Sequence, residues 1–369
     1  MSVNPVSERI VLYIWAGQWS LPSFDPLCLA TVLFLQVAIP GQFSIAECND
    51  PDLSPTGQLP FLTHDEQTVA SFGSIVKYIQ GLKSTGKPEY RNAKLDAHLS
   101  TYEKSQQTAW IAHIESHMGD LLHYTLYVRN WVDLTHSALV SMFPIPQSYY
   151  VPGRLRAAFK PRLEAAGLWT MSEELEEKSK PFTKKKTEEK EDSKRVFAQV
   201  FEKDRVLGKA KSILEIYSRL LGDRKYFYND QPSTIDILLA AHTLLLIKPP
   251  YPDSLIKDLV TGSYPNLVAH AQRVHGRTFH ETFTPIPLAP QHSSLVSLIP
   301  SWRRRNSTSL SEEDARYTRM RWGFYGLAIG GLVAFIAVMG LPEALIPDGW
   351  MQVDEEFLYD EGSVDDSDE

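Results

Sequence analysis

The first part of the chain begins with a short apolar run and then a longer one. Residues 9–15 are rich in β-branched and aromatic side chains, which predicts a short buried strand. Asp25 and Pro26 precede an apolar run that extends to residue 39. An aspartate followed by proline is typical of a helix start, because the carboxylate accepts from free N–H groups and proline lacks the N–H that would stay unpaired.

Three more apolar segments follow within the next fifty residues. Residues 43–48 read as a second strand, and Pro60 leads a third that pairs with a fourth in a hairpin. A helix is predicted from Phe72 to about Gly81. The order β-α-β-β-β-α predicts a compact mixed domain over residues 1–90.

From 91 to 285 the periodicity is helical, which predicts an all-helical second domain. A charged insertion at 173–195 interrupts it, with eight acidic and eight basic residues and almost nothing to bury. Proline, serine and arginine then dominate residues 286–317, a composition typical of an extended linker.

Residues 318–342 form the longest apolar segment, and from Trp322 to Leu341 they carry no charge. Twenty residues in a helix rise about 30 Å, the thickness of a hydrocarbon core. Trp322 and Tyr325 stand at one border, where amphipathic rings favour the membrane interface. The pattern predicts a single C-terminal transmembrane helix.

Small residues recur along this predicted helix at four-residue spacing, at Gly326, Gly330 and Ala334. Because they share one helical face, we expect that face to allow close approach of a neighbouring helix or barrel wall. Arginines precede the segment and only acids follow it. The bias of basic residues toward the cytosol places the body there and the tail across the membrane.

Charge changes the picture mainly at the C-terminus. The net charge is −8, yet residues 348–369 hold ten acidic and no basic residues, so residues 343–369 form an acidic tail on a nearly neutral body. This balance does not favour nucleic-acid binding. Two cysteines, Cys28 and Cys48, exclude a disulfide framework and suit a reducing compartment.

A search for catalytic chemistry yields no candidate catalytic, cofactor-binding or metal-binding residue. His113 and His117 lie one helical turn apart with Asp120 near the same face, but the spacing of a zinc-protease motif is absent. Zinc could be held by these side chains, and ordinary surface histidines are the other interpretation. The chain lacks a phosphate-binding loop and a nucleophile elbow.

The β-α-β-β-β-α unit with "QLPFL", followed by a helical half, resembles the glutathione-transferase fold, which combines a thioredoxin-like and an all-helical domain. This resemblance implies a cis peptide bond before Pro60. Ser233 and Asp236 match the S/T-x-x-D capping box of that fold's buried helix. The box has its own physical basis, since each side chain can bond the backbone N–H at the other position.

The residues that bind glutathione in such enzymes are only partly matched. Ser71 replaces the acidic residue and Phe72 replaces the serine that hold the γ-glutamyl group in the family. Ser20 or Ser23 could supply the activating hydroxyl after the first strand. These departures make a non-catalytic role the main expectation, and a membrane-anchored glutathione-dependent transferase is the alternative.

Four segments in order resemble metaxins: "WSLPSFDPLCLATVLFLQ", "NPDLSPTGQLPFLTH", "SFGSIVKY" and "FPIPQSYYVPGRLR". The resemblance covers about residues 1–285 and is closest to the fungal metaxin-like accessory subunit of the mitochondrial outer-membrane sorting and assembly machinery (SAM complex). It implies support for the insertion and release of β-barrel precursors and contact with the translocase through which precursors enter. It also implies contacts with the central β-barrel subunit, a second metaxin-like subunit, precursors and the lipid bilayer.

The resemblance further implies a location in the mitochondrial outer membrane, with most of the chain cytosolic and the acidic tail in the intermembrane space. No cofactor is expected. A tail-anchored adaptor on another organelle is the second alternative, because an apolar C-terminal segment alone does not identify the membrane.

Overall fold

The computed structural model separates the chain into two compact units, Met1–Ser309 and Leu310–Glu369. It describes residues 10–145, 147–169, 189–228, 230–281 and 312–339. Most of the charged insertion at 173–195 therefore lies outside the described residues. So do much of the linker at 286–317 and all of the acidic tail. The finer domain boundaries predicted from the sequence stay predictions.

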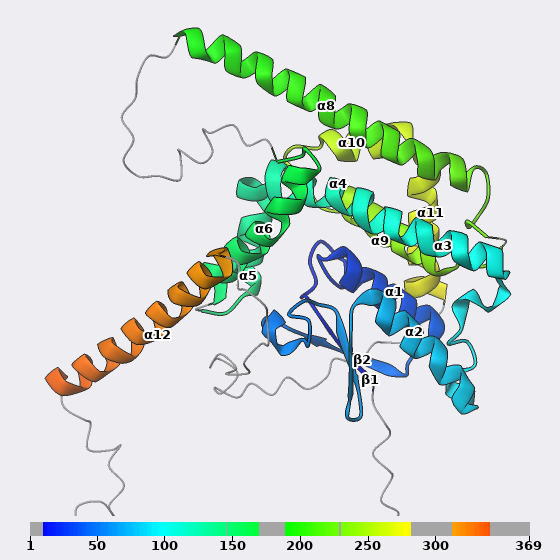
Figure 1. Cartoon of the computed structure of the whole chain (residues 1–369), viewed down its shortest axis with the longest axis horizontal. Helices are drawn as coiled ribbons and strands as arrows, with labels where there is room; N and C mark the ends of the chain where they lie inside the picture. The colour runs from blue at the N-terminus through cyan, green and yellow to red at the C-terminus, as the bar shows by residue number, and fades with distance from the viewer. Residues whose placement is uncertain (1–9, 146, 170–188, 229, 282–311, 340–369) are drawn as a thin grey trace, which may run out of the picture. The chain divides into compact units, whose positions relative to one another are not determined.

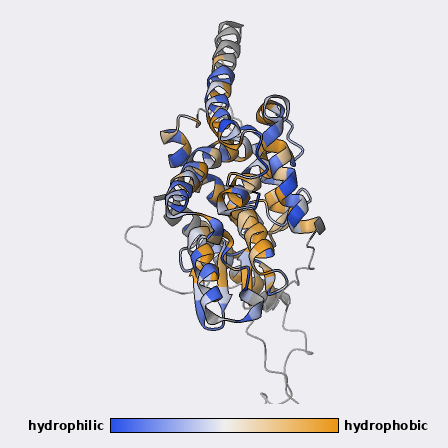
Figure 2. Ribbon diagram, turned by 90° about the vertical axis from the view of Figure 1, so that its right-hand side faces the viewer, coloured by the Kyte–Doolittle hydropathy of each residue, from blue (hydrophilic) through white to orange (hydrophobic). Residues whose placement is uncertain are grey.

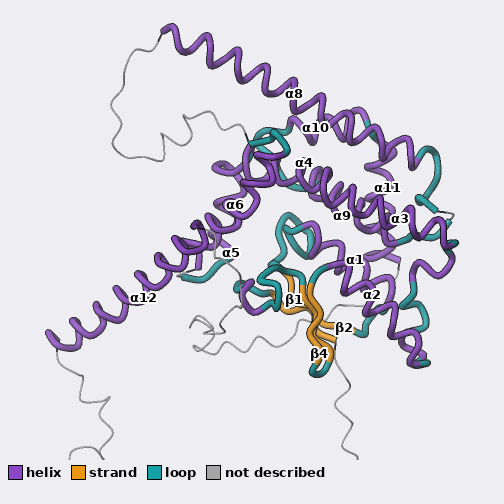
Figure 3. Tube along the Cα trace, in the orientation of Figure 1, coloured by secondary structure: helices purple, strands orange, loops and turns teal. Residues whose placement is uncertain are grey.

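One four-stranded sheet forms the first part of the larger unit (Figure 3). Its strands are β1 (Ile10–Ile14), β2 (Phe43–Glu47), β3 (Phe61–His64) and β4 (Gln67–Ala70). The order is β2-β1-β3-β4, with β1 parallel to β2 and the other pairs antiparallel. The predicted hairpin, β3 with β4, is confirmed.

Helix α1 (Pro26–Ala38) connects the parallel strands and begins where the sequence predicts. Asp25 Oδ1 accepts hydrogen bonds from the N–H groups of Leu27 (3.0 Å) and Cys28 (2.9 Å). Helix α2 (Phe72–Leu82) follows the hairpin and contacts both α1 and β4. The β-α-β-β-β-α unit is confirmed.

In the described residues, the larger unit is helical after the sheet and α2. Its α-helices in the described residues are α3 (Thr101–His113), α4 (Gly119–Tyr124), α5 (His136–Met142), α6 (Gln147–Ala165), α8 (Glu189–Leu221), α9 (Thr234–Ile247), α10 (Leu255–Ser263) and α11 (Pro265–Gly276). Four π-helical segments interrupt the α-helical pattern, at η5 (Ile114–Met118), η6 (Thr125–Arg129), η7 (Trp131–Thr135) and η8 (Arg277–Glu281). The 3₁₀ turn η4 (Leu95–His98) lies between the sheet half and α3.

The two halves meet where α1 packs against α9 (Figure 1). Both helices are apolar around most of their circumference, and every α9 residue from Thr234 to Leu246 is buried. A helix without a polar face needs partners on all sides, so α1 and α9 form the centre of one continuous core. Figure 2 shows hydrophobic positions gathered inside the body and hydrophilic positions on its outer helices.

The smaller unit contains helix α12 (Glu312–Met339), which begins before the predicted start at residue 318. Large apolar side chains on α12 are exposed, including Leu327 at 79% and Ile329 at 61%. In the part of the chain that the structure describes, no helix combines the length and apolarity needed to cross a membrane. The transmembrane assignment of 318–342 thus stays a prediction, and residues 340–342 lie outside the described range.

Candidate functional site

The region expected to bind glutathione is built from the β3 start and the α2 start. The peptide bond between Leu59 and Pro60 is cis, and the Pro60 carbonyl accepts from the Ser71 N–H at 3.1 Å. Phe72 is buried, with its ring edge against Phe34 at a centroid distance of 6.5 Å. An aromatic ring therefore occupies core space at the position where the enzymes carry a serine.

Ser71 has a left-handed backbone, with φ of 77°. Its Oγ donates to Ser74 Oγ at 3.0 Å, and both residues are exposed. A hydroxyl at this position carries no charge. It therefore gives the ammonium group of a γ-glutamyl moiety a much weaker partner than a carboxylate.

The candidate hydroxyls after β1 have different surroundings. Ser20 is exposed and has a left-handed φ of 61°. Ser23 is fully buried, and its Oγ accepts from the Asp25 N–H at 3.3 Å, which closes the turn before α1. Burial, reinforced by the nearby Asp25 carboxylate, raises the pKa of the Cys28 thiol well above its ordinary value. Cys28 is therefore held as a neutral thiol in the core.

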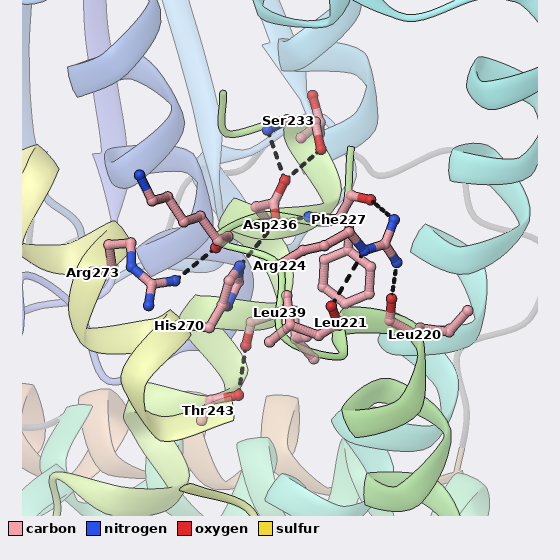
Figure 4. Close-up of polar contacts among 12 residues, drawn as sticks. Leu220, Leu221, Arg224, Phe227, Ser233, Asp236, Leu239, Thr243, His270 and Arg273 are labelled. Atoms are coloured by element: carbon pink, nitrogen blue, oxygen red, sulfur yellow. Dashed lines mark hydrogen bonds and ion pairs between the residues drawn. The ribbon is translucent and has the colours of Figure 1, made fainter. Parts of the chain in front are cut away.

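A buried polar cluster lies at the N-terminus of α9, where Ser233 and Asp236 form a capping box (Figure 4). Asp236 Oδ2 accepts from the Ser233 N–H (2.8 Å) and Oγ (2.6 Å). Its Oδ1 accepts from the Phe227 N–H (2.9 Å) and lies 2.9 Å from His270 Nε2. Asp236 and His270 are both fully buried, so one carboxylate joins the α9 start, the preceding loop and α11.

A second buried carboxylate bonds the same helix end. Asp96 in η4 accepts from the Thr234 N–H (2.9 Å, Oδ1) and from Thr234 Oγ1 (2.6 Å, Oδ2). Gln80 of α2 donates to Asp96 Oδ2 at 3.1 Å. The first N–H groups of a helix carry partial positive charge, so both carboxylates are favourably placed. The α9 start is therefore bonded to the connection between the halves and, through Asp96, to α2.

The loop before α9 is held by Arg224, whose Nη1 donates to the Phe227 carbonyl at 2.8 Å and whose Nε donates to the Leu221 carbonyl at 3.3 Å (Figure 4). Arg273 of α11 donates to the Lys225 carbonyl at 2.7 Å. These bonds order the loop that presents the Phe227 N–H to Asp236.

Two buried histidines lie near Gly119 at the start of α4. A Cβ on Gly119 would lie 3.3 Å from Arg162 Nη2 and 3.9 Å from both His123 Cε1 and His242 Nε2. His242 Nδ1 donates to the Leu238 carbonyl at 2.8 Å. Burial is the main cause that lowers the pKa of His242 to about 4. The hydrogen bond to the Leu238 carbonyl raises this pKa, and the positive charge of Arg162 lowers it further. Burial also lowers the pKa of His123 well below its ordinary value, so both rings are neutral in the fold.

The structure places the candidate zinc residues in separate interactions. His113 Nδ1 lies 2.6 Å from Tyr217 Oη, and the His113 and His117 rings are 4.3 Å apart. Asp120 is ion-paired with Arg162. Within the described residues, no group of three or more His, Cys, Asp or Glu side chains is arranged to hold a metal ion.

The remaining predicted residues lie on α12. Gly326 and Gly330 are exposed, as is Ala334, and a Cβ on either glycine would meet nothing within 4 Å. The Trp322 and Tyr325 rings have centroids 6.5 Å apart in an edge contact. The packing face and the interface role of these rings stay predictions.

Comparison with known proteins decides the relationship. The family model described as "Outer mitochondrial membrane transport complex protein" matches residues 28–156. Metaxin-1 of Mus musculus is 24% identical over 303 residues, which cover 81% of this chain and 84% of that protein. The Metaxin-1 homolog of Drosophila melanogaster is 22% identical, with 80% of this chain and 81% of that protein covered. Over most of its length the chain is similar to metaxins.

The helical half of the chain also matches the family model of the glutathione S-transferase C-terminal domain, over residues 210–274. Solved structures with similar folds include a glutathione S-transferase of Ceriporiopsis subvermispora. It is 16% identical, has a TM-score of 0.47, and has 98% of its chain covered by 75% of this one. Glutathione S-transferase III is 18% identical with a TM-score of 0.43, covering 76% of this chain and 99% of that one. Together with the observed strand order, the matched C-terminal domain confirms the glutathione-transferase-like fold.

Sequence reasoning identified Ser233 and Asp236 but missed Asp96 and His270. The Asp96–Thr234 bond joins residues 138 positions apart, and no local sequence pattern around Asp96 predicts it. His270 has a weak signal, because it is a histidine on the apolar side of an amphipathic helix. Such a residue needs a buried polar partner.

Proposed function

We propose that this protein is a metaxin and a non-catalytic subunit of the mitochondrial outer-membrane machinery that inserts β-barrel precursors. The observation that carries the proposal is the match to an outer mitochondrial membrane transport complex family over residues 28–156. That range includes α1, the hairpin and α2, the segment in which a transferase would bind glutathione. The similarity to a transport-complex family thus covers the same segment that would hold the substrate site in a transferase.

The non-catalytic part of the proposal is supported by the side chains in that segment. Phe72 is packed in the core, and Ser71 supplies a neutral hydroxyl in place of a carboxylate. Outside the matched range, in the turn before α1, the Ser23 hydroxyl is buried and bonded within that turn. A scaffold needs the shape of the fold and not this chemistry, so loss of the binding groups is expected in a scaffold.

The proposed partners are the central β-barrel subunit, a second metaxin-like subunit, the translocase through which precursors enter, and the precursors themselves. Attachment to the outer membrane is assigned to Trp322–Leu341, with the body in the cytosol and the acidic tail in the intermembrane space. Support comes from the uncharged sequence and from the exposed apolar side chains on α12, such as Leu332 and Phe335. Gly326, Gly330 and Ala334 are proposed to pack against a partner within the membrane.

Deletion of the gene, followed by quantification of outer-membrane β-barrel proteins, tests the role. We expect their steady-state levels to fall while tail-anchored outer-membrane proteins, the control class, keep theirs. Unchanged β-barrel levels would contradict the proposal. Affinity purification from solubilised mitochondria then identifies the bound subunits.

A second experiment addresses the transferase and adaptor alternatives. If the full chain is retained on immobilised glutathione and is eluted by free glutathione, the transferase alternative is supported. Sedimentation with peroxisomal or endoplasmic-reticulum membranes after carbonate extraction would favour an adaptor on another organelle. Replacement of Gly326 and Gly330 by leucine is expected to leave carbonate resistance intact and to lower co-purification of the partners.

A further inference from the structure

The segment from η7 through α6 combines exposed apolar side chains with an unusual charge pattern. Four large apolar residues on it are exposed: Val132 (63%), Val140 (37%), Ile145 (65%) and Tyr149 (71%). The elements that carry them are neighbours, since α5 contacts both η7 and α6. Figure 1 shows α5 and α6 side by side. A soluble surface rarely gathers exposed apolar residues of this size without a partner to cover them.

Basic residues outnumber acidic ones on this segment. Residues 131–165 contain four basic residues, Arg154, Arg156, Lys160 and Arg162, and two acidic residues, Asp133 and Glu164. Lys160 Nζ lies 3.9 Å from Glu164 Oε1, and Arg162 is ion-paired with Asp120. Tyr149, Arg156 and Lys160 are spaced at seven and four residues, so they lie on one face of α6. The basic side chains therefore stand on the same helix face as an exposed aromatic ring.

The basic groups are positioned by tryptophans. The Arg156 guanidinium lies over the rings of Trp131 (5.2 Å) and Trp169 (5.1 Å), and Lys160 Nζ lies 5.9 Å from the Trp169 ring. Arg156 Nε also donates to the Tyr127 carbonyl at 3.0 Å. Both tryptophans are partly exposed. We define the basic aromatic face as Trp131, Val132, Val140, Ile145, Tyr149, Arg154, Arg156, Lys160 and Trp169.

We propose that the basic aromatic face docks on a phospholipid surface that carries negative charge. Lysine and arginine near a membrane surface are attracted to anionic headgroups, and tryptophan and tyrosine favour the interface between headgroups and acyl chains. Exposed aliphatic tips such as Val132 and Ile145 gain by leaving water for that interface. A face with net positive charge and apolar tips meets each of these requirements, whereas a basic protein partner would be repelled by it. The inference concerns the larger unit and does not depend on a role in β-barrel assembly.

Collisional quenching in vesicles tests the proposal with the full chain. An environment-sensitive fluorophore is attached to Ile145→Cys or, as the control, to Tyr102→Cys on α3, where Tyr102 is 76% exposed. The two native cysteines are buried, and burial raises the pKa of the Cys48 thiol to about 12. Labelling should therefore select the introduced site. Vesicles contain phosphatidylcholine alone or with phosphatidylserine, and both carry a spin-labelled lipid as quencher.

We expect quenching at position 145 that rises with phosphatidylserine and falls with added salt, and little quenching at position 102. Lys160→Glu should lower the docked-to-undocked ratio at least about fivefold, because the lost basic residue contributes about 1 kcal/mol near a charged surface and the added carboxylate is repelled by it. Lys77→Glu on α2 makes the same change in net charge and should have no effect. The salt titration needs no charge variant, so the proposal stays testable even if Lys160→Glu fails to fold.

Equal quenching at positions 145 and 102, or quenching that ignores lipid charge, would overturn the proposal. So would a fluorophore at 145 that is already shielded before vesicles are added and does not respond to lipid. In that case an occupant other than lipid covers the face. Flotation of the same vesicles reports whether the chain is anchored. Flotation therefore tests the membrane anchor, and quenching at position 145 tests docking of the basic aromatic face, so that one can fail without the other.

Discussion

Removal of the Asp236 carboxylate should be among the most damaging single changes in the larger unit. The side chain is fully buried, and its oxygens accept three hydrogen bonds from Ser233 and Phe227 and contact His270. Two variants separate charge from volume. Asp236→Asn keeps the shape and one acceptor oxygen, and Asp236→Ala removes both oxygens.

The magnitude follows from the groups left behind. Each buried donor without an acceptor costs about 1–3 kcal/mol, and Asp236→Ala strands the N–H groups of Ser233 and Phe227. These losses overlap, because one carboxylate makes all the contacts. We therefore expect about 4 kcal/mol for Asp236→Ala and about 2 kcal/mol for Asp236→Asn. Either is a large fraction of the 5–15 kcal/mol that stabilises a typical fold.

Guanidinium chloride unfolding of the full chain in a mild detergent, followed by tryptophan fluorescence and far-ultraviolet circular dichroism, measures the free energy of unfolding. The matched control is Asp223→Asn, an exposed aspartate in the loop before α9, for which we expect a change within about 0.5 kcal/mol. If the free energy of unfolding of Asp236→Asn lies within about 0.5 kcal/mol of that of the unmodified chain, the carboxylate does not stabilise the α9 start.

Three further changes test other parts of the fold. Asp96→Asn should lower the free energy of unfolding by about 2 kcal/mol, because it weakens both bonds to Thr234 at the buried α9 start; exposed Asp133→Asn is the control, and equal effects would contradict the argument. His242 is neutral in the fold with a pKa of about 4, so the unfolded chain binds its proton first, and stability falls by about 3 kcal/mol as pH drops from 7 to 4. The stability gap between the unmodified chain and His242→Gln should narrow over that window, and parallel pH curves would refute the assignment. Phe72→Ser should cost about 3–5 kcal/mol by emptying core space without producing retention on immobilised glutathione, because Ser71 still lacks the carboxylate. Chemical unfolding measures the loss of stability, and glutathione-agarose measures glutathione binding. Retention of Phe72→Ser on glutathione-agarose would refute the statement that the substitution does not restore binding.

The local elements were predictable from sequence because their causes are local. Asp25 and Pro26 mark the α1 start through bonds that span two or three residues, and the predicted cap is observed. Hydrophobic runs of strand length, separated by turn residues, are enough to place the hairpin and the succession of strands along the chain. Helical periodicity likewise identified the second half, although the π-helical segments between 114 and 135 were not foreseen, because single-residue shifts in hydrogen bonding leave hydrophobic spacing nearly unchanged.

The sequence by itself determined the fold class, the buried helix that begins after Ser233, and the loss of the acidic glutathione ligand at Ser71. Only the tertiary structure decided that Asp96 and His270 complete the cluster at the α9 start, since these bonds join residues far apart in the chain. It likewise placed Arg156 between Trp131 and Trp169, contacts that depend on how η7 and α6 pack. Long-range pairings of this kind arise from the packing of whole elements, and no window of sequence contains the geometry that creates them.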